Sequence, residues 1–266
     1  MQAKEFYREG KLSEAIAAAL EDVKAHPGEA GARGFLCQLL CFAGELERAE
    51  RQLDALAQID AKVSVGVSLV RHLLRAEQAR RQFLSDGRLP EFLEPPPPEL
   101  KSRIEAAILL REKKPAEAAA ALERAESHHT PVSGVCDGKP FDDFRDLDDL
   151  CGSSFEVFTS NGKYYQIPFA KVELVEFHPP EDIQDLLWRT AHMVVREGPD
   201  GKVYLPALYC GTHASSDDRL RLGRATDWQG GDGAPARGVG QRMFLAGDRE
   251  AGILEIKTIE FRAAGA

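Results

Sequence analysis

Cys210 and His213 have the spacing of a metal-ligand pair, a cysteine and a histidine separated by two residues. A structural zinc site needs four nitrogen or sulfur ligands, which usually come as two close pairs. The other candidate ligands offer no second pair at this spacing: His128, His129, Cys136 and Cys151. We expect His128 and His129 at the solvated end of a helix. The sequence therefore favours a buried cysteine beside a histidine at a strand end, and it predicts no bound metal.

Aspartates crowd one short segment of the chain, as Asp142, Asp143, Asp146, Asp148 and Asp149. Their carboxylates could hold a hard cation, but the segment lacks the glycine and the regularly spaced oxygens of a calcium loop. A solvated segment that begins a helix is therefore favoured.

Phosphate-binding and nucleophile motifs are poorly matched. Glycines crowd residues 230–240, but the lysine-containing phosphate loop is absent, and no strand, glycine loop and helix follow one another there. No nucleophile-elbow motif surrounds the serine pairs at 153–154 and 215–216. We therefore expect a long flexible loop at residues 230–240, no cofactor and no catalytic residue.

Arg224, Asp227 and Trp228 lie within one short segment. An arginine and a carboxylate can form a two-pronged ion pair, and an indole offers a large flat surface beside it. Such a group can lock a loop as well as bind a ligand, and the structural role is favoured.

The elements that would position these residues begin with a repeated pattern. Residues 10–15 (GKLSEA) are echoed 34 residues later by residues 44–49 (GELERA), and each copy continues into an amphipathic helix. This period is that of a tetratricopeptide repeat, a helix–turn–helix unit that must stack on a neighbour to bury its apolar face. Such stacks usually bind other proteins.

Further helices are predicted at residues 63–83, 99–111 and 115–126, with a stiff proline spacer at 95–98. Residues 113–118 loosely resemble the earlier motif, so we expect the stack to continue with distortion. Two regular copies are too few for a free-standing solenoid, and the later helices are expected to complete and cap it.

After residue 129 helical periodicity largely ends, and glycine, aromatic and β-branched residues become more frequent. Residues 155–158 and 164–167 flank an Asn-Gly pair and predict a hairpin. Strands are also predicted at 171–177, 191–196, 203–208 and 253–261, with a helical turn at 182–188. The predicted fold is α+β, with a TPR-like helical domain at residues 1–129 and a mainly β domain at 130–266.

Composition limits the classes of partner. The chain has 266 residues, a net charge of −9 and 43% hydrophobic residues, which fits a globular protein with a substantial core. The negative charge argues against nucleic acid or an anionic membrane as the main partner. Residues 1–12 lack the apolar core of a secretory signal, and no apolar run could span a bilayer. Five scattered cysteines favour reduced thiols and a cytoplasmic location.

Several motifs together resemble a known family, the ImpE/SciE family of TagJ-type accessory proteins of bacterial type VI secretion. After the helical repeats they are residues 145–150 (RDLDDL), 179–180 (PP), 185–191 (DLLWRTA), 205–209 (LPALY), 222–228 (LGRATDW) and 238–245 (GVGQRMFL). The resemblance spans nearly the whole chain, and the block with Arg224, Asp227 and Trp228 is its most specific part, with Trp188 in another motif.

The resemblance implies a cytoplasmic, non-enzymatic adaptor. Members are expected to engage the N-terminal helix of the TssB-type small contractile-sheath subunit. They are also expected to be linked to the ClpV ATPase, which recycles the sheath. Two alternatives remain: a small metal-dependent enzyme in the C-terminal domain, and a general TPR-like scaffold outside secretion.

A candidate partner-binding surface follows from the repeat alignment. If Ala15 and Ala49 are the small residues of the second helices, the first helices point six residues toward the concave side: Lys4, Tyr7, Arg8, Gln38, Cys41 and Phe42. A partner helix could lay apolar residues on Tyr7 and Phe42, with polar contacts at the rim. Packing of Tyr7 and Phe42 between the repeats is an equally open alternative.

Overall fold

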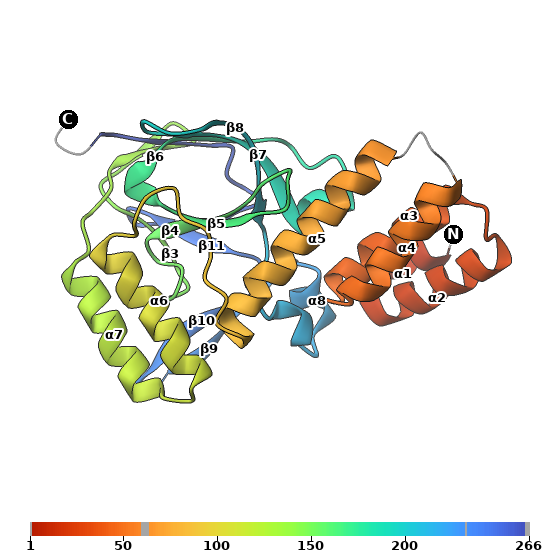
Figure 1. Cartoon of the computed structure of the whole chain (residues 1–266), viewed down its shortest axis with the longest axis horizontal. Coiled ribbons are helices and arrows are strands. Elements are labelled where there is room, and N and C mark those ends of the chain that lie inside the picture. Colours follow the sequence, from red (N-terminus) through yellow and green to blue (C-terminus); the bar gives the residue numbers. More distant parts are fainter. Residues whose placement is uncertain (1, 60–63, 232, 264–266) are drawn as a thin grey trace.

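The computed structural model describes residues 2–59, 64–231 and 233–263, and the first half of the chain is helical (Figure 1). The longer helices are α1 (Gln2–Arg8), α2 (Leu12–Ala25), α3 (Ala30–Phe42), α4 (Leu46–Ile59), α5 (Ser64–Ser85), α6 (Pro98–Arg111) and α7 (Pro115–Ser127). These bounds confirm the predicted α+β class and agree with the helices expected at 63–83, 99–111 and 115–126, of which residue 63 lies outside the described residues.

The two predicted repeats form the helical hairpins α1–α2 and α3–α4. At each turn a glycine takes a left-handed backbone conformation, with φ of 79° at Gly10 and 76° at Gly44. Glycine adopts this conformation readily because it has no Cβ. Ala15 and Ala49, the small residues used for the alignment, are fully buried.

The hairpin α6–α7 does not continue this stack, so that expectation was wrong. Figure 1 shows it at the other end of the molecule from α1–α4, with α5 between them. The chain is diverted before the proline spacer, because Glu91 pairs with the sheet: its N–H donates to Tyr164 O at 2.9 Å, and its carbonyl accepts from Gln166 N at 3.2 Å. The proline spacer then leads into α6, and α7 packs on a strand of the C-terminal half.

The second half is built on an antiparallel sheet with the strand order β2-β1-β13-β6-β7-β8-β4-β5. Its strands are β1 (Gly134–Cys136), β2 (Lys139–Phe141), β4 (Ser154–Phe158), β5 (Tyr164–Pro168), β6 (Val172–Phe177), β7 (Trp188–Val195), β8 (Asp200–Pro206) and β13 (Thr258–Phe261). The predicted hairpin at 155–167 is β4–β5, with Gly162 at a φ of 85° in its turn.

Smaller elements complete this half. They are β3 (Phe144–Asp146), β9 (Thr226–Gly231), β10 (Ala234–Gly240), β11 (Met243–Ala246), β12 (Arg249–Gly252), the 3-10 helices η2 (Phe169–Lys171), η3 (Ile183–Leu186) and η4 (Thr212–Ala214), and α8 (Asp218–Arg221). β12, β11 and β3 form one small sheet, and β10 and β9 form another.

Three expectations for this half were wrong. Residues 230–240 are not a loop, because most of them belong to the β9–β10 hairpin. The closing strand is shorter than predicted, since residues 253–255 form a turn and residues 256–257 an irregular stretch before β13. The acidic segment begins no helix, and its residues Asp146 and Asp148 are buried rather than solvated because arginines pair with them.

Within the described residues, the buried apolar side chains form two cores. One lies within the C-terminal half and is rich in packed phenylalanine rings, among them Phe144, Phe155 and Phe169. The other joins α1–α7 to residues of the C-terminal half, including Trp188 and Leu208. Helix gives way to strand between Ser127 and Gly134. The division into domains 1–129 and 130–266 stays a prediction.

Candidate binding groove and its supports

Two hollows flank α3 and together form what we call the α3 groove. The larger, about 860 Å³, lies among α1, α2, α3 and the start of η3. The smaller, about 300 Å³, lies among α3, α4, α5 and η3 and has a mainly apolar lining that includes Cys37, Leu53 and Val67. Both hollows share Gly31, Gly34 and Gln38, so α3 presents a backbone ridge between them.

The six residues predicted for the concave surface divide into three groups. Lys4, Tyr7, Arg8 and Gln38 line the larger hollow. Cys41 lines the smaller one. Phe42 lies in neither; it is 1% exposed, and its ring centroid is 6.4 Å from that of Tyr7. Phe42 is thus placed between the repeats, as the alternative for this residue expected, whereas Tyr7 both packs and faces the larger hollow.

Gly31 and Gly34 are among the groove residues that the sequence analysis missed. A glycine inside a helix costs about 1 kcal/mol relative to alanine. Neither position needs glycine for packing, because an added Cβ would meet no atom within 4 Å. Two glycines three residues apart within a helical pattern were the available signal for an open helix face.

The wall of the larger hollow is aromatic and its rim is polar. Tyr7 and Phe35 meet edge to face at 6.1 Å between centroids, and Lys4 Nζ lies 5.9 Å from the Phe35 centroid. Burial is the main cause that raises the pKa of Tyr7, so its hydroxyl stays protonated at neutral pH. Gln38 Nε2 donates to Asp182 Oδ1 at 2.7 Å, which ties α3 to the residue before η3.

Arg224 of the LGRATDW motif contacts the first repeat instead of Asp227. Its guanidinium donates to the carbonyls of Tyr7 and Arg8, and it lies 5.1 Å from the Tyr7 ring centroid. Asp227 accepts from the adjacent Trp228 N–H at 2.8 Å. Arg224 therefore does not form the ion pair with Asp227 that the sequence suggested. It instead joins the C-terminal half to α1.

The two tryptophans of the motifs occupy different environments. Trp188 is 3% exposed and belongs to the core shared with the helices. Trp228 is 42% exposed on the β9–β10 hairpin, and its ring centroid lies 5.8 Å from that of Tyr209. Trp188 is therefore part of the core that joins the helices to the C-terminal half, and neither tryptophan lines a hollow of the groove.

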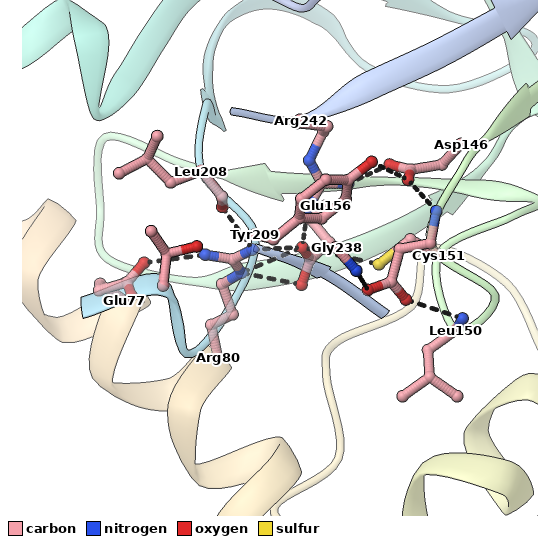
Figure 2. A network of polar contacts seen from close by, with 12 residues as sticks. Glu77, Arg80, Asp146, Leu150, Cys151, Glu156, Leu208, Tyr209, Gly238 and Arg242 are labelled. Atoms are coloured by element: carbon pink, nitrogen blue, oxygen red, sulfur yellow. Dashed lines mark hydrogen bonds and ion pairs between the residues drawn. The ribbon is translucent and has the colours of Figure 1, made fainter. Parts of the chain in front are cut away.

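A buried ionic network links α5 to the sheet (Figure 2). Glu156 of β4 accepts hydrogen bonds from Arg80 of α5, from Arg242 and from the Tyr164 hydroxyl, the last at 2.6 Å. Burial alone would raise the pKa of Glu156, but the charges of Arg80 and Arg242 outweigh it and hold that pKa far below its usual range. Glu156 therefore remains ionised, and it is the residue that Arg80, Arg242 and Tyr164 all contact.

The aspartates of the acidic segment extend this network. Asp146 accepts from Arg242 Nη1 at 2.7 Å and from the Tyr209 hydroxyl at 3.0 Å, and Asp148 accepts from Arg237 Nε at 2.9 Å. Burial raises the pKa of Asp146 to about 6 despite the attraction of Arg242. The carboxylates of Asp146 and Asp148 are paired with arginines and a tyrosine of the same chain. These internal contacts account for the cluster of aspartates without a bound cation.

The Cys210 and His213 pair lies at the junction of the halves. The His213 ring packs over Gly44, where an added Cβ would lie 2.5 Å from it. Burial lowers the pKa of His213 and raises that of Cys210 to about 11. His128 is exposed at the end of α7, but His129 is partly buried between Glu99 and Asp143. Within the described residues, no group of three or more His, Cys, Asp or Glu side chains could hold a metal ion.

Comparisons with known proteins place the chain in a family. A sequence model described as ImpE protein matches residues 138–260, and a tetratricopeptide-repeat model matches residues 6–73. The chain is 32% identical over 267 aligned residues to the type VI secretion system accessory component TagJ of Pseudomonas aeruginosa PAO1, covering all of this chain and 93% of TagJ.

The crystal structure of protein VPA1032 from Vibrio parahaemolyticus has the same fold. It superposes with a TM-score of 0.92 at 26% identity, over all of this chain and 99% of that one. Among the described residues no helix has the length and apolar character to cross a membrane. From its full-length similarity to TagJ and the ImpE match, the chain belongs to the ImpE family of TagJ-type proteins.

Proposed function

We propose that this protein is a non-enzymatic accessory component of a bacterial type VI secretion system, and that its α3 groove binds the N-terminal helix of the small contractile-sheath subunit. The full-length similarity to TagJ supports the secretion role. The observation that carries the binding role is the open backbone ridge at Gly31 and Gly34, with a hollow on each side.

The groove has features that a helix would use. Packed helices lie about 8–10 Å apart, depending on the side chains between them, and glycines allow the closest approach. A partner helix lying along the ridge would place apolar side chains in the smaller hollow, against Leu53, Leu56 and Val67. Its polar side chains would face Lys4 and Arg8 across the larger one.

The proposal includes a cytoplasmic location and a functional link to the ClpV-type ATPase that recycles the sheath. Both parts come from the family resemblance. Such an adaptor needs no turnover, because it acts by holding one component near another.

The test is calorimetric titration with a peptide of the sheath subunit's N-terminal helix. Gly34→Leu would fill the ridge, and we expect it to weaken binding by about 100-fold, the effect of losing an interface hot spot. The variant should remain folded, because leucine favours helix over glycine by about 1 kcal/mol.

Ala120→Leu is the matched control, since it adds the same side chain to an exposed position of α7, away from the groove. It should bind as the unmodified protein does. Failure of the unmodified protein to bind the peptide, or normal binding by Gly34→Leu, would overturn the proposal.

A further inference from the structure

Residues 211–224, which we call the clamp segment, contact the turns of both helical hairpins. The segment includes η4 and α8, and α8 lies beside the repeat helices in Figure 1. Its contacts fall on Gly10 and Gly44, the two glycines of the 34-residue echo.

At the first turn, Arg224 completes the end of α1. The last carbonyls of a helix have no partner within the helix, and they carry partial negative charge. Arg224 Nη1 donates to Arg8 O at 2.8 Å, and its second terminal nitrogen donates to Tyr7 O. A positive side chain 216 residues away in sequence thus caps this helix.

Asp218 completes the start of α2 at the same turn. The residue before α2, Lys11, makes no side-chain cap. Instead, Leu12 N donates to Asp218 Oδ2 at 2.7 Å, and Ser13 N lies 3.4 Å from the same oxygen. A carboxylate is favourable at a helix N-terminus, so the clamp segment supplies the preferred charge to each side of Gly10.

The second turn is held in a related way. The His213 ring covers Gly44, and Arg81 Nη1 of α5 donates to Gly44 O at 2.8 Å. The third turn, at Lys113, differs: it takes a left-handed φ of 60° with an ordinary side chain and is exposed. The two turns that the C-terminal half covers therefore have glycine at the left-handed position, whereas the solvent-exposed turn has lysine there.

We infer that the clamp segment is the positioning device of the repeats: Arg224 and Asp218 cap α1 and α2 from the C-terminal half and thereby set the width of the α3 groove. The path to the groove is short, because Arg224 lies over Tyr7, and Tyr7 packs on Phe35 of α3. Neither Arg224 nor Asp218 lines either hollow. Both are positioning residues, since they act through α1 and α2.

The direct test is hydrogen exchange of the full chain without a partner. Arg224→Gln and Asp218→Asn should each accelerate exchange in α1 and at the start of α2 by about tenfold or more, since each removes the charge that strengthens a hydrogen bond at this turn. The helices α6 and α7 should be unchanged. Arg224→Lys keeps the positive charge without the paired donors, so partial rescue is expected.

Arg219→Gln is the matched control. Arg219 also belongs to α8, but its side chain is 73% exposed and pairs with the neighbouring Asp217. Unchanged exchange in α1 and α2 of the Arg224 and Asp218 variants would overturn the inference, as would equal acceleration in all helices, which would mean global destabilisation.

A second readout, the affinity for the sheath-helix peptide, rests on the proposed function. Both variants should weaken it by about tenfold, because a mobile α1 must be ordered again on binding. If the unmodified protein does not bind the peptide, the proposed function fails while the exchange result still decides the clamp. Unchanged affinity together with accelerated exchange would overturn the link between the clamp and the groove.

Discussion

Arg80 and Glu156 form a buried, two-pronged ion pair that fastens the longest helix to the sheet. Arg80 Nη2 lies 2.8 Å from Glu156 Oε2, and Nε lies 3.0 Å from each carboxylate oxygen. Arg80 also donates to the carbonyl of Leu208 at 2.9 Å. Through this one side chain, α5 is joined both to β4 and to the chain that leads into the clamp segment.

We expect Arg80→Met to lower the free energy of unfolding by about 3–5 kcal/mol, because it removes one partner of a buried ion pair. Urea unfolding followed by circular dichroism measures the effect. Arg71→Met is the control on the same helix: Arg71 pairs with the more exposed Glu50 and Asp54, so its loss should cost less than about 1 kcal/mol. Equal effects of the two substitutions would contradict the assigned role of the network.

The second prediction concerns pH and Asp146. Its pKa in the folded protein is raised from 3.8 to about 6, so the folded state takes up this proton at a higher pH than the unfolded chain does. The contribution of Asp146 to stability is therefore greatest below about pH 4 and is lost as pH rises through about 6. The rise of this pKa from 3.8 to about 6 limits the contribution of Asp146 to the free energy of unfolding to about 3 kcal/mol.

The comparison that isolates this effect is Asp146→Asn, which cannot titrate. The stability of the unmodified protein relative to this variant should fall between pH 4 and pH 7. The contribution of Glu156 to stability depends on pH in the opposite direction, because its depressed pKa stabilises the fold above about pH 4.5. Both proteins contain Glu156, so its contribution cancels in the comparison. Asp142→Asn controls for charge removal at an exposed position of the same segment. A relative stability that rises with pH would refute the prediction.

The third prediction concerns the turn at Gly44. Gly44→Ala should lower the free energy of unfolding by more than about 1 kcal/mol, because alanine is strained at positive φ and its Cβ would overlap the His213 ring. Thermal unfolding is the measurement. Gly28→Ala is the control, since Gly28 has no positive φ and an added Cβ would meet no atom within 4 Å.

A double-mutant cycle separates the two causes at Gly44. His213→Ala removes the two closest ring atoms but keeps Cβ, which would lie 2.7 Å from the added Cβ. It therefore relieves part of the overlap and leaves the backbone strain, so Gly44→Ala should cost less in the His213→Ala background than alone. Purely additive effects would show that the ring and the turn do not interact.

Local sequence patterns determined much of the secondary structure. Apolar residues at helical spacing indicated the helices, and the glycines at 10 and 44 marked the repeat turns, because helix periodicity and left-handed turns depend on near neighbours. The Asn-Gly pair at 161–162 gave the β4–β5 hairpin for the same reason. The motifs after residue 145 also indicated the family without any knowledge of the fold.

Only the tertiary structure decided which side chains meet. The sequence predicted a solvated Asp146, but in the fold Asp146 is paired with Arg242. Arg224 donates hydrogen bonds to α1 and does not pair with Asp227. The position of α6–α7 likewise depended on the pairing of Glu91 with a strand more than 70 residues away. The sequence by itself determined the helices, turns and family, because these are encoded in short segments. The groove, its clamp and the buried charges required the fold, since hydrogen bonds and burial join residues that sequence spacing does not relate.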